Sequence, residues 1–382
     1  MHSHAHPFPY LNSLPQPNLQ NHNNLAIQTL QLNLLLSSPT SFLLLLAASA
    51  MVVCSKPELD TFSVINDCKP TTFVSEIPVI DLSKSDAKTL VVKACEEIGF
   101  FKVINHGVPM ELISILESEA VKFFSLPQPR KEEAGLANPF GYGNKRIGSN
   151  GDIGWIEYLL LRSNPEFISE RSLSIFGESQ EMFCSAINDY ISALKMMTCE
   201  ILELVAEGLG IEQINVFSKL LTEEESDCLF RINHYPPCPD LQGLSCPNVI
   251  GFGEHTDPQI ISVLHSNNST GLEISLRDGT WVSVPPDQSS FFINVGDSLQ
   301  VMTNGRFKSV KHRVLANGLN SRVSMIYFGG PPLDEKIAPI PSLMEEGEES
   351  LYKEFTWSEY KSSVFKARLV DNKLENFEKG SE

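Results

Sequence analysis

The chain has 382 residues, of which 42% are hydrophobic, so it can bury the core of one large domain or two smaller ones. Its formal net charge of −18 argues against nucleic acid as a partner, because a phosphate backbone requires a basic surface. The charge also argues against long-range attraction of anionic substrates, although a local basic patch could still hold one.

Residues 1–55 differ in composition from the rest of the chain, because no Asp, Glu, Lys or Arg precedes Lys56. The apolar run from Phe42 to Cys54 is too short to span a bilayer. Basic residues typical of signal and transit peptides are absent. We expect a disordered extension, or one outside the functional protein with Met51 as a candidate start. Organelle targeting is the alternative.

The eight cysteines are scattered and form no CxxC pair. Several fall within apolar helical patterns, which favours buried, reduced thiols over a disulfide framework. We therefore expect a cytoplasmic protein that is not associated with a membrane.

From residue 77 the pattern becomes that of a globular domain. Short strands are predicted at 77–82 and 100–105, and helices at about 90–98, 109–124 and 183–208. Residues 127–175 predict loops and short strands. The stripe of apolar residues along the last of these helices indicates core packing, not a cofactor site.

From Leu229 the hydrophobic period changes from 3.6 to 2, which predicts strands. The expected strands cover about 229–235, 249–254, 260–265, 271–276, 280–284, 290–295, 298–302, 309–314 and 321–328. Asp278-Gly279 predicts a hairpin. So many short strands indicate a sandwich or jelly roll, and a final helix is expected from Trp357 to Phe377.

A candidate metal site begins at His255-Thr256-Asp257, at the end of a predicted strand. Residues i and i+2 of an extended chain share a face, so His255 and Asp257 can bind one ion. His312, on a later strand, is a candidate third ligand. Two imidazoles and a carboxylate are typical of non-haem Fe(II) oxygenases, and zinc could use a similar set. Taken alone, the motif is explained more simply by His255 at the end of a strand and Asp257 in a turn before Pro258.

A second pair, Arg322 and Ser324, shares one face of a predicted strand ten residues beyond His312. Arginine can bind a carboxylate through two parallel hydrogen bonds, and an inward-facing arginine is costly without an anion. 2-Oxoglutarate would supply that anion. The alternatives are a structural salt bridge or an outward-facing arginine.

Together these residues carry a resemblance to the plant 2-oxoglutarate-dependent dioxygenases, over about residues 57–378. The matching motifs are Ile77-Pro78-Val79-Ile80-Asp81, Gly99-Phe100-Phe101-Lys102-Val103-Ile104-Asn105-His106-Gly107, Asn233-His234-Tyr235-Pro236-Pro237-Cys238, His255-Thr256-Asp257, His312-Arg313-Val314 and Arg322-Val323-Ser324.

The resemblance implies an α+β fold, with a double-stranded β-helix (jelly-roll) core flanked by helices. It implies an N-terminal, mostly helical region at 56–225, the core at 226–335, and a C-terminal helix and tail at 336–382. Fe(II) is assigned to His255, Asp257 and His312. 2-Oxoglutarate is assigned to Arg322 and Ser324, assisted by Tyr235 and Asn233. His106 and His234 are then structural.

The implied reaction is hydroxylation with O2 and 2-oxoglutarate as co-substrates and ascorbate as a candidate reductant. Residues 141–148 and 154–159 are similar to those of gibberellin 2-oxidases of the C19 type, which implies 2β-hydroxylation of a gibberellin and loss of its hormonal activity. A gibberellin carries a carboxylate, so a cation is expected in the pocket. Lys145 and Arg146, beside Tyr142, are candidates, and a solvated basic loop is the alternative.

Two other hypotheses remain at this stage. The chain could be another plant dioxygenase, such as a different gibberellin oxidase or a flavonoid oxidase. It could also be a catalytically silent jelly-roll protein that binds a small ligand.

Overall fold

The structure is a computed structural model that describes residues 64–65, 72–73, 77–148, 150–238 and 248–380. The chain divides into two compact units, residues 1–51 and 52–382. The first unit, and with it the extension predicted at 1–55, lies outside the described residues. The architecture below is that of the second unit.

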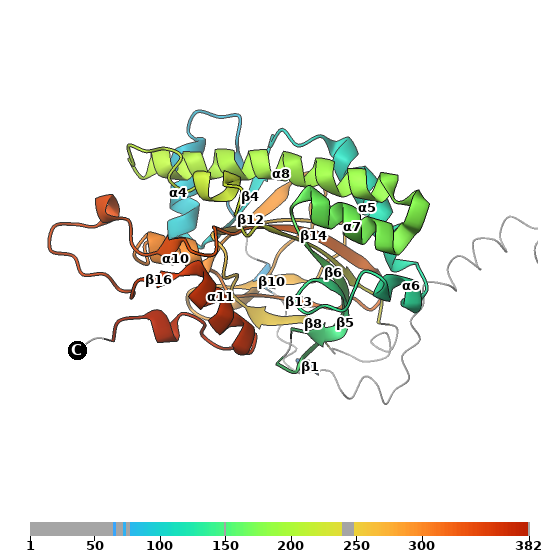
Figure 1. The fold of residues 1–382 in the computed structure, drawn as a ribbon. Coiled ribbons are helices and arrows are strands. Elements are labelled where there is room, and N and C mark those ends of the chain that lie inside the picture. The colour runs from blue at the N-terminus through green and yellow to red at the C-terminus, as the bar shows by residue number, and fades with distance from the viewer. Residues whose placement is uncertain (1–63, 66–71, 74–76, 149, 239–247, 381–382) are drawn as a thin grey trace, which may run out of the picture. The chain divides into compact units, whose positions relative to one another are not determined.

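An eight-stranded major sheet runs through this unit (Figure 1). In spatial order its strands are β3 (Val79–Asp81), β4 (Phe100–Ile104), β12 (Phe291–Val295), β9 (Ile261–Ser266), β14 (Arg322–Gly329), β7 (Leu229–Tyr235), β6 (Asp152–Arg162) and β5 (Gly141–Ile147). Neighbours are antiparallel except for β3 and β4. Strands from the first half of the chain therefore extend a sheet whose centre comes from the second half.

A six-stranded minor sheet faces the major sheet. Its order is β1 (Val64–Ile65), β8 (Asn248–His255), β13 (His312–Leu315), β10 (Leu272–Ser275), β11 (Trp281–Ser283) and β2 (Thr72–Phe73). One buried cluster joins Tyr235 and Phe292 of the major sheet to Phe252 and Ile274 of the minor sheet. This arrangement confirms the expected jelly-roll core.

The predicted hairpin is also confirmed. Strands β10 and β11 are antiparallel, and Ser275 lies opposite Trp281. Gly279 between them has a φ of 81°, a left-handed conformation that favours glycine.

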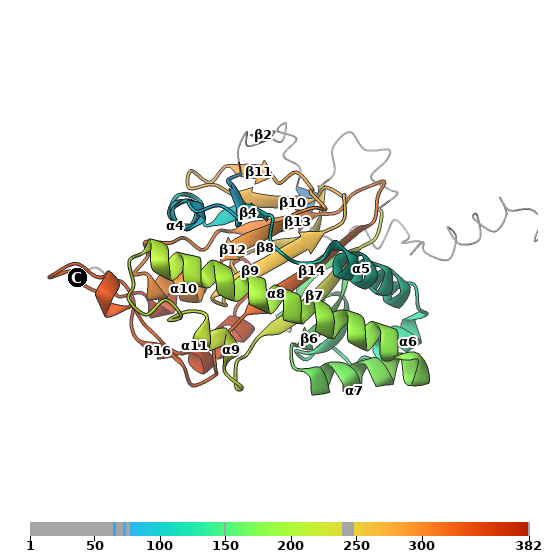
Figure 2. The same ribbon diagram turned by 90° about the horizontal axis from the view of Figure 1, so that it is seen from above.

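Helices cover the outer face of the major sheet, and Figure 2 shows α8 lying across it. The α-helices of the described residues are α4 (Ala87–Glu97), α5 (Met110–Phe124), α6 (Gln128–Glu132), α7 (Pro165–Phe176), α8 (Glu181–Gly208), α9 (Lys219–Thr222), α10 (Asp297–Met302) and α11 (Trp357–Lys366), of which α4, α5, α7 and α8 lie on the outer side of the major sheet and α11 lines the cavity. In α8, Tyr190 and Leu194 share a core with Phe230 and Met325 of the sheet. No helix in the described part of the chain combines the length and the apolar character that crossing a bilayer requires.

Strand β14 illustrates how the two faces of the major sheet differ. Val323 and Met325 belong to the core beneath the helices. Arg322, Ser324 and Ile326, at the alternate positions, line a cavity between the two sheets. The period-2 pattern therefore sends the polar residues of β14 to the inside of the jelly roll.

Two predicted elements differ from the structure. The strand expected at 298–302 is the helix α10, because a short apolar run fits either element and Asp297 favours a helix start. The last helix ends at Lys366, not Phe377. Asn150 donates to the carbonyls of Phe365 and Ala367, so a tertiary contact, not a local sequence signal, accompanies the helix end.

Residues 127–175 are more regular than the sequence predicts. They contain the eleven-residue strand β6, whose two faces are both buried along most of its length. Burial on both faces removes the alternation that marks a strand. They also contain α7, which begins with a proline, Pro165, at its first turn.

Candidate metal centre

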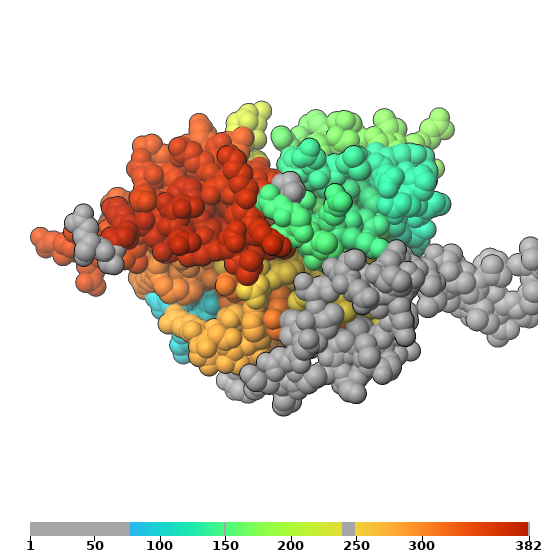
Figure 3. Space-filling view, turned by 90° about the horizontal axis from the view of Figure 1, so that it is seen from below, coloured from blue at the N-terminus to red at the C-terminus, as the bar shows by residue number. Residues whose placement is uncertain are grey.

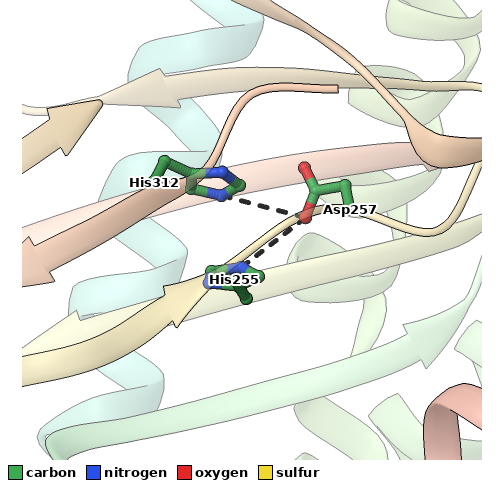
Figure 4. A group of neighbouring side chains, drawn as sticks. All are labelled: His255, Asp257 and His312. Atoms are coloured by element: carbon green, nitrogen blue, oxygen red, sulfur yellow. Dashed lines mark ion pairs between the residues drawn. The ribbon is translucent and has the colours of Figure 1, made fainter. Parts of the chain in front are cut away.

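Three candidate ligands lie close together where β8 ends and β13 begins in the minor sheet (Figure 4). His255 ends β8, His312 begins β13, and the two are direct cross-strand partners. Asp257 follows two residues after His255. Its Oδ1 lies 3.6 Å from Nε2 of His255 and 3.8 Å from Nε2 of His312. One ligand atom from each residue lies within 4.8 Å of the others, so the three can share one ion.

Backbone carbonyls orient both imidazoles. Nδ1 of His255 lies 2.8 Å from the carbonyl oxygen of Gly253, and Nδ1 of His312 lies 3.3 Å from that of Val310. A carbonyl only accepts hydrogen bonds, so each Nδ1 carries the proton and each Nε2 presents a lone pair. This is the tautomer that coordination of a metal through Nε2 requires.

Hydrogen bonds likewise orient Asp257. Its Oδ2 accepts from Ser262 Oγ at 2.7 Å and from Asn294 Nδ2 at 2.8 Å, which leaves Oδ1 to face the imidazoles. Burial alone would raise the pKa of Asp257. The charges of His312 and His255 and these hydrogen bonds outweigh burial and lower the pKa below its ordinary value. The carboxylate is therefore ionised.

The charge state of His255 also suits a metal. Burial, followed by repulsion from a charged His312, lowers the pKa of His255 well below its ordinary value. A neutral imidazole beside an ionised carboxylate is the donor set that Fe(II) binds, and three protein ligands leave positions open on a six-coordinate ion. The residues present therefore fit iron.

The metal ligands line a cavity of about 290 Å³ between the sheets. Much of its wall is apolar, including Phe252, Leu264 and Ile326. The C-terminal segment closes one side. There Arg368 forms an ion pair with Asp152 at 3.0 Å. Figure 3 shows this red segment beside the green part of the chain.

Arg322 lies in the same cavity and is only 2% exposed. Its Nε and Nη1 have no hydrogen-bond partner in the described part of the chain. Its guanidinium carbon lies 5.4 Å from the centre of the Tyr235 ring. Ser324 and Asn233 lie beside it and are linked by a 3.4 Å hydrogen bond. A buried cation with unpaired N–H groups indicates a site for an anion.

The predicted substrate residues Tyr142, Lys145 and Arg146 are not among the residues that line the cavity. The hydroxyl of Tyr142 is buried and donates to Glu157 at 2.6 Å. Arg146 is exposed on β5. The structure therefore does not bring these three side chains to the metal centre, because the strand that carries them lies at the edge of the major sheet.

The two histidines expected to be structural make hydrogen bonds away from the metal group. His106 Nδ1 accepts from the backbone N–H of Val108 at 3.2 Å. His234 Nδ1 lies 2.7 Å from Glu157 Oε1.

Several site residues escaped prediction from the sequence. Ser262 and Asn294 bind Asp257 from strands distant in sequence, and no local pattern connects them to it. Arg231 also lines the cavity. The sequence could have predicted this, because Arg231 lies two residues before Asn233 and four before Tyr235. Residues at this spacing share one face of a strand. Lys373, from the tail, lines the cavity as well.

Comparison with protein families agrees with this site. Residues 226–331 match the model of the 2OG-Fe(II) oxygenase superfamily, and residues 77–173 match the N-terminal model of non-haem dioxygenases in morphine synthesis. Gibberellin 2-beta-dioxygenase 1 of Pisum sativum is 66% identical over 329 residues, which cover 86% of this chain and 99% of that protein. The Phaseolus coccineus gibberellin 2-beta-dioxygenase is 60% identical, covering 87% of this chain and 99% of that protein.

A solved structure agrees in fold. The crystal structure of JOX2 in complex with 2OG, Fe and JA superposes with a TM-score of 0.74 at 26% identity. The match covers 87% of this chain and 97% of that chain.

Proposed function

The chain belongs to the 2OG-Fe(II) oxygenase superfamily and, within it, to the gibberellin 2-beta-dioxygenases, and from this membership we propose that it hydroxylates C19 gibberellins at the 2β position and thereby inactivates the hormone. The observation that carries the proposal is the 66% identity to the pea enzyme in a chain that also holds the His255, Asp257 and His312 cluster.

The same observations weigh against the other hypotheses. Relatives named gibberellin 2-beta-dioxygenases range from 66% to 40% identity, which favours position 2 of a gibberellin over another position or a flavonoid. An intact ligand cluster in a cavity argues against a catalytically silent binding protein.

In the proposed site, Nε2 of His255, Oδ1 of Asp257 and Nε2 of His312 would hold Fe(II). Bound iron supplies, with O2 and 2-oxoglutarate, the oxidising power for hydroxylation, in which one oxygen atom enters the substrate and the other enters succinate as CO2 leaves. Ascorbate would serve as an accessory reductant. A neutral His255 and an ionised Asp257 are ready to bind the metal without first losing protons.

Arg322 is proposed to bind the distal carboxylate of 2-oxoglutarate through two parallel hydrogen bonds. Ser324 and Tyr235 would each donate a hydroxyl hydrogen bond, and Asn233 would position Ser324. Burial raises the pKa of Tyr235, so its hydroxyl keeps its proton and remains a donor. These groups orient the co-substrate, and the apolar wall excludes water from the reacting atoms.

Product analysis tests the proposal. The protein is incubated with Fe(II), 2-oxoglutarate and ascorbate, and with C19 gibberellins, C20 gibberellins or flavonoids in separate reactions. We expect 2-hydroxylated C19 products by mass spectrometry, with one succinate released for each product, and no product when a chelator removes iron. Absence of gibberellin turnover would refute the substrate assignment, and unchanged iron binding would then leave the metal assignment standing.

We further propose that the protein acts in the cytoplasm on small molecules, without a nucleic-acid partner. Support comes from the net charge of −18 and from the free thiols of Cys95, Cys184, Cys199 and Cys228. A fluorescent fusion of the full chain that accumulates in an organelle would contradict the location.

A further inference from the structure

The basic residues that line the cavity fall into two groups. Three of them use acceptors of the protein. Lys361 pairs with Asp227 at 2.6 Å, Arg368 pairs with Asp152, and Lys373 donates to the carbonyl of Thr256 at 2.6 Å. The other two, Arg322 and Arg231, have buried N–H groups without a partner in the described part of the chain. The cavity therefore has two cations available for ligands.

The strand register separates these two arginines. Arg322 of β14 pairs with Tyr235 of β7, whereas Arg231 of β7 pairs with Ile326 of β14. Their backbone positions therefore differ by four residues, about 13 Å along the strands. If 2-oxoglutarate spans the distance from iron to Arg322, both of its carboxylates already have partners. Arg231 is then available for a different anion.

The surroundings of Arg231 hold its guanidinium in one orientation. The guanidinium carbon lies 3.8 Å from the ring centre of Tyr158 on the major sheet and 4.8 Å from that of Phe252 on the minor sheet. Nε donates to Asn233 Oδ1 at 2.7 Å. Nη2 is buried and lacks a partner, and Arg231 forms no ion pair with any carboxylate of the described residues. Stacking on two rings and one hydrogen bond thus fix the planar guanidinium and leave the N–H groups of Nη2 for a ligand.

The rest of the cavity is suited to a hydrocarbon body. Leu160 and Ile326 flank Arg231 on the neighbouring strands, and Leu264 lines the same cavity. An apolar molecule with one carboxylate would match a cavity with one free cation in an apolar wall.

We propose that Arg231 binds the carboxylate of the organic substrate and makes the enzyme selective for apolar carboxylic acids over their neutral analogues. The inference rests on the proposed function and assigns to Arg231 the substrate recognition for which Lys145 and Arg146 were the sequence candidates. Since Asn233 bridges Arg231 and Ser324, one hydrogen-bonded series joins the substrate site to the co-substrate site.

The test compares a gibberellin with its methyl ester, which differs in the charge of the carboxylate. Wild-type enzyme is expected to prefer the acid. In Arg231→Gln we expect kcat/KM for the acid to fall on the order of 10²-fold, with little change for the ester, so that the preference disappears. Arg231→Lys should show part of the preference, because lysine keeps the positive charge but lacks the planar guanidinium that can form two parallel hydrogen bonds. Arg306→Gln, which alters an exposed arginine paired with Glu96, is the matched control and should behave as wild type.

The KM for 2-oxoglutarate distinguishes the two anion sites. In Arg231→Gln it should change far less than kcat/KM for the acid, because Arg231 reaches the co-substrate site only through Asn233. A large rise in that KM, with the acid-to-ester preference intact, would mean that Arg231 serves the co-substrate, and the proposal would be wrong.

Thermal-shift measurements keep the test independent of gibberellin turnover. A panel of apolar monocarboxylic acids and their methyl esters is added to wild type and to Arg231→Gln, with Fe(II) and 2-oxoglutarate under nitrogen. Acids should stabilise wild type more than esters do, and the difference should vanish in the variant. If gibberellins are not turned over but this difference is present, only the proposed function fails. Equal stabilisation by acids and esters in wild type overturns the Arg231 proposal.

Discussion

At the residue scale, each metal ligand has one atom fixed by the protein and one left free. Both imidazoles direct Nδ1 to a carbonyl, and Asp257 uses Oδ2 for two hydrogen bonds. The free atoms, Nε2, Nε2 and Oδ1, are the ones that face each other. Orientation by neighbouring groups reduces the entropy lost when the metal binds.

Removing one ligand should therefore remove the metal site. In His312→Ala we expect loss of measurable Fe(II) binding by calorimetry under nitrogen and loss of succinate production, because two ligands hold iron weakly. Lys311→Ala changes the adjacent, exposed residue and should keep both properties. Turnover retained in His312→Ala would refute the ligand assignment.

The residues that orient Asp257 should contribute less, but measurably. Asn294→Ala removes one of its two hydrogen bonds. We expect Fe(II) affinity to fall by roughly 10- to 100-fold while the fold is retained. Asn320→Ala, at an exposed position, is the control. Equal affinities in the two variants would show that Asn294 does not position the ligand.

At the element scale, a buried polar cluster joins β5, β6, β7 and α6. Glu157 of β6 accepts hydrogen bonds from Lys131 of α6 at 2.5 Å and Tyr142 of β5 at 2.6 Å, and lies 2.7 Å from Nδ1 of His234 of β7. Both Lys131 and Glu157 are buried. The cluster thus fixes the edge of the major sheet next to strands that carry the cavity wall.

Glu157→Gln should destabilise the protein strongly, because it leaves the buried Lys131 charge without a counter-charge. We expect the free energy of unfolding to fall by about 3–5 kcal/mol in urea titrations. Glu354→Gln breaks an exposed lysine–glutamate pair of similar length, with Lys336 at 2.7 Å, and should cost far less, because solvent screens the pair. If the unfolding free energy fell by a similar amount in both variants, burial of the Lys131–Glu157 pair would not explain the loss.

The effect of Glu157 should also depend on pH. Burial alone would raise its pKa, but the hydrogen bond and charge of His234, followed by Lys131, lower it below the ordinary value of 4.5. With a lower pKa when folded, Glu157 contributes its full stability above the unfolded pKa and loses it as the pH falls through the folded pKa. The difference between wild type and Glu157→Gln should therefore shrink as the pH falls from about 7 to below about 4. If the difference in unfolding free energy did not change with pH, the ionised carboxylate of Glu157 would not be its source.

The elements also show what sequence patterns can predict. Strands such as β14 were predicted because polar and apolar residues alternate in the sequence, as in Arg322-Val323-Ser324-Met325, although both faces of the strand are buried. Strand β6 was missed because its second half, Tyr158 to Leu161, lacks this alternation. Helix α10 was taken for a strand because all but one of its six residues are buried, which leaves no periodic contrast.

At the scale of the whole molecule, the sequence predicted the ligand motifs but not the residues from distant segments that contact the ligands or line the cavity. His255, Asp257, His312 and Arg322 were identified from short motifs on strands. Ser262 of β9 and Asn294 of β12 donate hydrogen bonds to Asp257, and Arg231 of β7 lines the cavity. These roles depend on the order β12-β9-β14-β7 in the folded sheet. Contacts between distant segments leave no local pattern, so such residues require the tertiary structure.

The uneven distribution of charge predicts which part of the chain is needed for activity. No Asp, Glu, Lys or Arg precedes Lys56, so the entire net charge of −18 belongs to the remainder. The pea relative matches this chain over 99% of its own length but only 86% of this chain. The second compact unit, which contains His255, Asp257 and His312, begins at Val52.

A variant that begins at Met51 should therefore keep the thermal midpoint, the Fe(II) affinity and the kcat/KM of the full chain. The reason is that, among the described residues, the contacts that orient the ligands and line the cavity all come from positions after that point. The measurements are calorimetry, metal titration and succinate release on both proteins side by side. A lower midpoint or weaker iron binding in the shorter protein would show that residues 1–50 contribute to the folded enzyme. A change confined to the cellular location of a fusion would instead favour the targeting alternative.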